Sequence, residues 1–243
     1  MPKIPTMPDI GRIVSEAVNS VIPDVGQIVN DAVKGVFVGT LASDSDAVVF
    51  PENLRRLTVK SIGGADLTLL HTHEARLRVE GRCKVSACGE EEVQLGGLKE
   101  DVTLHVPITV PHIDLHLTGG GDVDGRLEDL NGHRIVLHAP GGGDIAVSIG
   151  RMSESTLELS APGGGDITLT VPEDAGFEIT MDAIGGGDIH TELPLEESGK
   201  RSAHSFQGRR NGGGTSRIKI SAPGGGDIQL LKLSETAEGK RET

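Results

Sequence analysis

Aromatic residues are nearly absent from this chain of 243 residues, which has no tryptophan, no tyrosine and only four phenylalanines. Small-molecule pockets and single-strand nucleic-acid sites both depend on aromatic side chains, so the composition argues against either. Acidic residues also outnumber basic ones, and the net charge is -13. Because nucleic-acid binders present a basic surface to the phosphates, we expect no nucleic-acid partner.

A long apolar run is missing as well. Charged residues such as Asp9, Glu16, Asp24 and Lys34 interrupt the most apolar region, so no segment is suited to span a bilayer and membrane contact is peripheral at most. The first residues show no basic stretch leading into an apolar segment and no small-residue cleavage site. We therefore expect a cytoplasmic protein, with membrane association limited to the surface.

Catalytic and redox motifs are missing too. The two cysteines, Cys83 and Cys88, are five residues apart, which fits neither a CxxC redox pair nor a zinc knuckle, so we expect reduced structural thiols. The sequence holds no GxSxG, HExxH or P-loop pattern. We predict no enzymatic activity, no catalytic residues and no organic cofactor.

Residues 1–40 contain a tandem duplication, in which PDIGRIVSEAVNSVI is followed by PDVGQIVNDAVKGVF. In each copy the apolar residues recur at i, i+3, i+4 and i+7, the pattern of an amphipathic helix. We predict a pair of helices that dock on the rest of the chain, on a second subunit or on a membrane surface. The residues expected to make this contact are Ile13, Val14, Val18, Ile28, Val29 and Val33.

A 22-residue repeat dominates the remainder. The string GGGD ends at Asp122, Asp144, Asp166 and Asp188, and again at Asp227 after 39 residues. On both sides of each GGGD, apolar and polar residues alternate with period two, which indicates a strand, a glycine corner and a second strand. A unit this short cannot bury its own apolar face, whereas stacked units can.

We therefore predict a mainly β fold: a parallel β-solenoid of about 22-residue coils over residues 41–233, preceded by the helical pair and followed by a polar tail, 234–243. The segment DVTLHVP, from Asp101, and the stretch from Leu57 to Leu69 fit the same template as variant coils. The interval of 39 residues implies a 17-residue insertion within about 194–215, expected as a loop that leaves one corner.

The repeated aspartates would stand in a column at the ~4.8 Å spacing of stacked strands. One interpretation is that each carboxylate caps its own corner through an Asx-type hydrogen bond. A second is that a bound calcium ion relieves the repulsion between neighbouring carboxylates, each pair of which costs about 0.9 kcal/mol in water. The predicted metal ligands are then Asp122, Asp144, Asp166 and Asp188.

The insertion carries a local basic run in this acidic chain, and it offers a second contact surface for an acidic partner or another subunit, unless it is a solvated loop. Its candidate contact residues are Arg201, Arg209 and Arg210. Among the histidines, His112 and His116 share one strand face but lie about 13 Å apart, too far for one metal ion. We expect these two, and also His71 and His73, at the surface.

The units GGGDIAVSI, GGGDITLTVPEDAGFEI and GGGDIHTELPL, and after the gap NGGGTSRIKISAPGGGDIQL, resemble the bacterial β-strand-repeat family labelled "putative adhesin" and the related toast-rack domains. The resemblance covers roughly residues 46–233. It implies a parallel β-helix-like domain without known catalysis, often linked to membranes or to cell-envelope stress.

These observations together predict a non-enzymatic scaffold or interaction module that forms a homo-oligomer or binds a protein partner. The helices and the ends of the solenoid would make the contacts, because unpaired strand edges invite further pairing. The alternative is a peripheral membrane-associated sensor or regulator of cell-envelope stress, with the helices on lipid.

Overall fold

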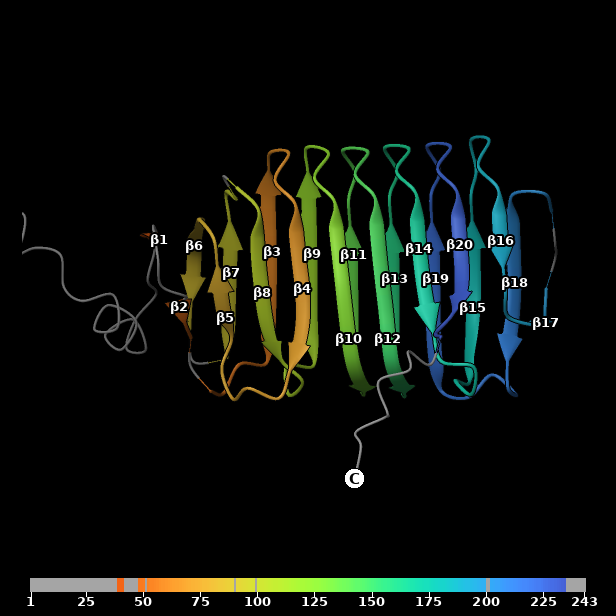
Figure 1. Cartoon of the computed structure of the whole chain (residues 1–243), viewed down its shortest axis with the longest axis horizontal. Helices are drawn as coiled ribbons and strands as arrows, with labels where there is room; N and C mark the ends of the chain where they lie inside the picture. Colours follow the sequence, from red (N-terminus) through yellow and green to blue (C-terminus); the bar gives the residue numbers. More distant parts are fainter. Residues whose placement is uncertain are drawn as a thin grey trace, which may run out of the picture.

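The structure is a computed structural model that describes residues 39–41, 48–50, 52–89, 91–98, 100–199 and 202–234. These residues form β-strands and no helix, so the chain is mainly β as predicted. The strands (Figure 1) are β1 Gly39–Leu41, β2 Val48–Val49, β3 Arg56–Ile62, β4 Leu67–Thr72, β5 Arg78–Glu80, β6 Cys83–Cys88, β7 Glu92–Gly96, β8 Val102–Pro107, β9 His112–Thr118, β10 Val123–Asn131, β11 Arg134–His138, β12 Ile145–Ser153, β13 Thr156–Ser160, β14 Ile167–Val171, β15 Phe177–Asp182, β16 Ile189–Thr191, β17 Glu196–Glu197, β18 Ser205–Arg210, β19 Ser216–Ser221 and β20 Ile228–Lys232.

The predicted helical pair lies outside the described residues, apart from Gly39 and Thr40, which belong to β1 and pair antiparallel with β6. The contact residues proposed for the helices, Ile13 to Val33, are outside as well. So is the polar tail after Ser234.

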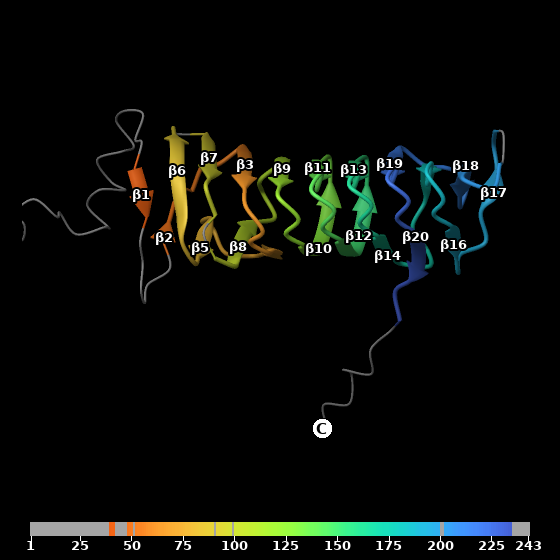
Figure 2. The ribbon, with the colours of Figure 1, turned by 90° about the horizontal axis from the view of Figure 1, so that it is seen from above.

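The strands form two sheets that face each other, seen as two rows in Figure 2. Sheet A has the order β1-β6-β7-β3-β9-β11-β13-β19-β15-β18-β17, and sheet B has the order β16-β20-β14-β12-β10-β4-β8-β5-β2. From β9 to β16 the chain alternates between the two sheets, one strand at a time. We call a strand of sheet A, its glycine corner and the following strand of sheet B a unit.

Units 22 residues apart pair in parallel with no offset, because each repeat places the same residue type at the same height. In sheet B, Val123 pairs with Ile145, and Ile145 with Ile167. In sheet A, Ile113 pairs with Ile135, and Ile135 with Leu157. An offset of one residue would turn the apolar side chains to solvent, so the alternation of the sequence determines this register.

The core is a narrow aliphatic layer between the sheets. Inward-facing residues are almost fully buried along every unit, for example Leu137 and Leu159 in sheet A and Val147 and Leu169 in sheet B. Alanine occupies the position where four of the units bend toward their corners, and all four are buried: Ala139, Ala161, Ala183 and Ala222. In the unit β9–β10 the equivalent residue is the buried Leu117. Aliphatic side chains of one size stack well at strand spacing, which is why this core needs few aromatic residues.

The glycine corners stand in a row along one edge of the molecule (Figure 1), and they pack backbone against backbone. In the corner before Asp144, a Cβ on Gly141 would lie 2.2 Å from the nitrogen of Gly120, and a Cβ on Gly143 would lie 2.1 Å from the carbonyl oxygen of Gly121. Gly142 has φ +92°, a conformation that favours glycine. Close approach of the neighbouring backbone thus requires glycine at the first and third positions, and the positive φ favours it at the second.

The units are not stacked in chain order. The unit β19–β20 lies between β13–β14 and β15–β16, and the unit β3–β4 lies between β7–β8 and β9–β10. The stack therefore departs from chain order at both ends. Equivalent corners and equivalent apolar rows let units that are distant in the sequence pair with each other, so neighbours in sequence need not be neighbours in space.

The predicted insertion loop is also a different structure. Residues 196–210 contain β17 and β18, and β18 pairs antiparallel with β15 at the end of sheet A. The segment covers a strand edge that would otherwise expose backbone donors and acceptors. It does not leave a corner as a solvated loop.

The terminal strands of both sheets are short, with three residues in β1, two in β2, two in β17 and three in β16. Three of these four pair antiparallel with their neighbours, and β16 pairs parallel with β20. Short edge strands and reversed strands limit edge-to-edge pairing. The described ends are therefore poorly suited to head-to-tail stacking of copies.

The close approach at the corners predicts a large cost for one methyl group. Gly143→Ala should lower the free energy of unfolding by about 1–3 kcal/mol, because its Cβ meets backbone that cannot move aside. Urea unfolding followed by circular dichroism measures the change. The control is Gly64→Ala, where the nearest atom to a Cβ is 3.6 Å away and φ is not in the left-handed region; an equal loss in both variants would contradict the explanation.

Candidate functional site

The aspartates that follow the glycine corners form a continuous column of hydrogen bonds. Up to the last member, Asp188, each exposed carboxylate accepts a hydrogen bond from the backbone N–H of the aspartate in the next unit. For example, Asp144 N donates to Asp122 Oδ1 at 2.8 Å, and Asp166 N donates to Asp144 Oδ1 at 2.8 Å. The spatial order of the column is Asp101, Asp66, Asp122, Asp144, Asp166, Asp227 and Asp188.

This geometry changes two sequence-based expectations. The aspartates do not cap their own corners, because their acceptor oxygens reach the neighbouring unit. Asp188 does not follow Asp166 either; Asp227 stands between them, since β20 lies between β14 and β16. The four aspartates proposed as calcium ligands are thus part of a longer column. Asp122, Asp144 and Asp166 each supply one oxygen to a backbone amide, and Asp188, at the end of the column, donates its own amide to Asp227.

The described residues contain no group of three or more His, Cys, Asp or Glu side chains in a geometry that could hold a metal ion. The column presents its carboxylates singly, one per strand spacing. Calcium binding by Asp122, Asp144, Asp166 and Asp188 therefore stays a prediction.

The outer face of sheet A is flat and covered by charged side chains that pair between strands. Lys219 Nζ lies 2.9 Å from Glu158 Oε1, and Arg209 Nε lies 2.8 Å from Glu196 Oε2. These pairs join neighbouring strands and are solvent-exposed, so each contributes about 0–1 kcal/mol to stability. Their main consequence is a surface with regularly spaced charges of both signs.

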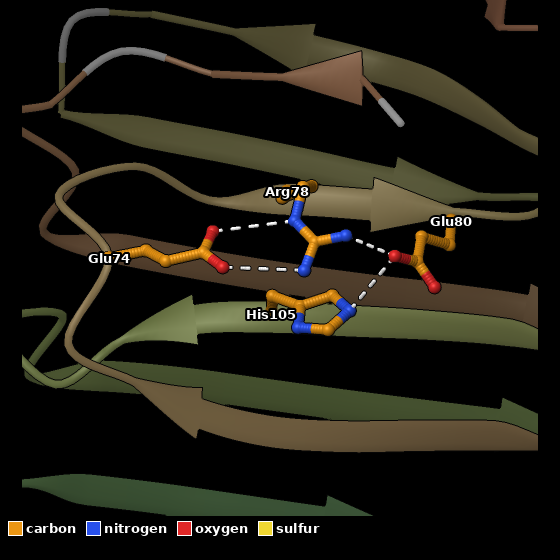
Figure 3. Close-up of polar contacts among 4 residues, drawn as sticks. All are labelled: Glu74, Arg78, Glu80 and His105. Atoms are coloured by element: carbon orange, nitrogen blue, oxygen red, sulfur yellow. Dashed lines mark hydrogen bonds and ion pairs between the residues drawn. The ribbon is translucent and has the colours of Figure 1, made fainter. Parts of the chain in front are cut away.

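The outer face of sheet B carries a second polar cluster where β5 and β8 pair (Figure 3). The Arg78 guanidinium contacts Glu74, 3.3 Å from Oε1, and also Glu80. Nε2 of His105 lies 3.3 Å from Oε1 of the same Glu80. The hydrogen bond to Glu74 and the charges of both glutamates raise the pKa of Arg78, so the cluster carries a permanent cation between two carboxylates.

Arg210 is buried and has a structural role. Its Nη1 donates to the carbonyl oxygen of Pro194 and its Nη2 to that of Glu173, both at 2.8 Å, so it joins two loops beside β18. The expectation that Arg210 contacts a partner is a misassignment, because it is only 8% exposed. Arg209 faces solvent and pairs with Glu196, whereas Arg201 lies outside the described residues.

Next to these loops is a hollow of about 1180 Å³. It lies where β20 ends, and Lys232 and Glu173 form an ion pair on its wall. The hydrogen bond from Lys232 lowers the pKa of Glu173, so this carboxylate is ionised and paired. The residues that line the hollow are Pro172, Glu173, Asp174, Glu192, Asn211, Lys232, Leu233 and Ser234.

His71 is buried, at 3% exposure, so its predicted surface position is wrong. It packs edge-to-face against His133, with 5.4 Å between ring centroids. His133 Nδ1 accepts a hydrogen bond from Asn131 N and its Nε2 donates to Ile108 O, so its tautomer is defined. Neither ring nitrogen of His71 has a hydrogen-bond partner among the described residues.

The remaining candidates lie where the alternation placed them. His112, Asp114 and His116 are on the outer face of β9, opposite the buried Ile113 and Leu115. Cys83 is a free and buried thiol, and burial raises its pKa to about 11, in keeping with the expected structural role. In the described part of the chain, no helix is long and apolar enough to cross a membrane.

Comparison with known proteins adds little. No family model and no curated protein matches the chain. Among solved structures, it is similar to the crystal structure of a putative cell adhesion protein from Clostridium sporogenes, with 15% sequence identity and a TM-score of 0.42, over 81% of this chain and 100% of that one. A similarity at this level carries no argument about function, and the resemblance to the adhesin-labelled family stays a prediction.

The column predicts different effects for two substitutions of one aspartate. Asp144→Ala should lower the free energy of unfolding by about 1–3 kcal/mol, because the N–H of Asp166 loses its acceptor. Asp144→Asn keeps an acceptor oxygen and relieves repulsion along the column, so its loss should be less than half as large. Chemical denaturation of both variants measures this. Equal losses would mean that charge, and not the hydrogen bond, holds the corner.

Burial of His71 predicts acid sensitivity. Desolvation and the nearby His133 lower its pKa from 6.5 to about 4, against the opposing charge of Asp129. The unfolded chain therefore binds a proton near pH 6.5 that the folded chain does not bind until about pH 4, so stability falls by about 3 kcal/mol as the pH drops between these values.

His71→Leu should remove this part of the pH dependence with little loss of stability at pH 7, because neither ring nitrogen is hydrogen-bonded. Thermal unfolding of both proteins between pH 4 and pH 7 is the measurement. The exposed His190 provides the control, His190→Leu. Parallel stability curves for the wild type and His71→Leu would rule out His71 as the source.

Proposed function

We propose that this chain is a β-solenoid that acts as a non-enzymatic interaction module, and that it assembles with itself or with a protein partner through its flat faces. The solenoid assignment is supported by the in-register parallel pairing of units, by the alternation of successive strands between the two sheets, and by the row of equivalent corners.

The extent of the outer faces is the observation that carries this proposal. The two sheets have 11 and 9 strands, so each face is roughly 40–50 Å long and about 17 Å wide at ordinary strand spacing and rise. That is an area of roughly 800 Å², the size that one partner contributes to a standard protein–protein interface. A rigid flat surface of this size suits a macromolecular partner better than a small ligand.

The charge pattern of the outer faces and the short strands at the ends of the sheets also support contacts through the faces. Outward-facing side chains of both charge signs lie on neighbouring strands. Mixed charges across an interface define its register and its specificity. The short terminal strands favour contacts through the faces over contacts through the ends. The net charge of -13 makes a protein partner more plausible than a nucleic acid.

Light scattering after size exclusion of the full chain tests self-assembly. We expect a defined oligomer, and we expect a charged residue placed on the contact face to dissociate it. Val136→Lys changes the outer face of sheet A, where this half-buried valine stands between Asp114 and Glu158. Thr168→Lys changes the outer face of sheet B.

The double variant Val14→Asp and Val29→Asp tests the N-terminal contact residues predicted from the sequence, and Glu16→Gln with Asp31→Asn is its matched control on the polar side of the same pattern. Dissociation by a face variant supports the proposal. If only the N-terminal variant dissociates the oligomer, the faces are not the contact surface. A wild-type chain that is monomeric at every concentration would reject self-assembly.

A further inference from the structure

Two histidines meet on the outer face of sheet A because the strands pair in register. His116 on β9 is the direct partner of His138 on β11, and their ring centroids are 5.3 Å apart at an interplanar angle of 61°. They are 22 residues apart in sequence, and nothing in the spacing of either histidine alone indicates a pair. Both side chains are partly exposed, so an ion can reach them from solvent.

A carboxylate lies against the same pair. Oδ1 of Asp114 is 2.8 Å from Nε2 of His116. This oxygen is itself buried, and it accepts no well-aligned hydrogen bond in the described structure. A buried carboxylate oxygen normally has a partner, and the polar atom that the structure places beside this one is the imidazole nitrogen of His116.

We propose that His116, His138 and Asp114 form a binding site for a borderline divalent transition-metal ion such as Zn²⁺. Imidazole and carboxylate are ligands that this class of ion accepts. Two imidazoles that share one tetrahedral zinc, with Zn–N of about 2.0–2.1 Å, have ring centres roughly 5 Å apart. The observed separation is close to that value.

Binding needs rotation of the ligand side chains. The described residues hold no three ligands already at metal geometry, so the His138 ring must turn to aim a nitrogen at the ion. The 2.8 Å contact between Nε2 of His116 and Oδ1 of Asp114 must open to admit the ion, and any proton between the two atoms is released to solvent. Three protein ligands leave a fourth position for water or for a partner's side chain.

The surrounding charges are mixed. Burial and the neighbouring His116 lower the pKa of His138, so this imidazole is neutral and available as a ligand at pH 7. Glu158, on the next strand, adds negative charge near His138, although it also pairs with Lys219 at 2.9 Å. The exposed Lys60 is the partner of His116 on β3 and opposes a cation.

Zinc titration of the full, untagged chain by calorimetry at pH 7.5 tests the site. We expect one ion per chain, and an affinity at least about tenfold lower in His116→Asn, in His138→Asn and in Asp114→Asn. The control is His190→Asn, a substitution of an exposed histidine on β16 that should leave binding unchanged. Lys60→Gln should tighten binding, because it removes a like charge.

A second measurement separates ligation from damage to the fold. Zinc should raise the melting temperature of the wild type and of His190→Asn but not of His116→Asn or His138→Asn, while all four proteins melt alike without zinc. Acidification should weaken the zinc effect, because protons compete with the metal ion for its ligands. The proposal would be overturned if the wild type bound no zinc, or if His116→Asn and His138→Asn bound zinc as tightly as the wild type does.

Discussion

The contact between neighbouring glycine corners is the constraint on which the rest of the structure depends. The backbones approach so closely that the third glycine of a corner has no room for a Cβ, and the aspartate that follows accepts the amide of the next unit. Close approach brings the strands on both sides to pairing distance, and the directional hydrogen bond sets their height. Together with the alternation of apolar and polar residues, this contact gives the in-register sheets and the stacked aliphatic core.

A contact of this kind does not select which unit packs next to which, because each unit presents the same donor and the same acceptor to its neighbour. The unit β19–β20 can therefore sit between β13–β14 and β15–β16, while β18 covers the outer edge of β15. The chain thereby places regular units in the middle of the stack and irregular, antiparallel strands at its ends. Such an arrangement protects sheet edges, which are otherwise prone to pair with other chains.

In-register stacking also determines what the surface can do. A residue that repeats every 22 positions becomes a column, and different residues at one position become neighbours 4.7–4.9 Å apart. The charge pairs of sheet A and the contact of His116 with His138 arise in this way. The proposed interaction faces and the proposed zinc site are consequences of the same register.

The repeat by itself determined the strand–corner–strand unit, the inward and outward faces and the identity of the core residues, because period-two alternation and a constant spacing are local properties. Only the tertiary structure decided the order of the units, the antiparallel cap formed by β17 and β18, the burial of His71 and Arg210, and the meeting of His116 with His138. Those features depend on which equivalent unit lies next to which. The sequence does not indicate the order of the units, because the corners are alike and several orders satisfy the same local pattern. Only the packing of the ends distinguishes these orders.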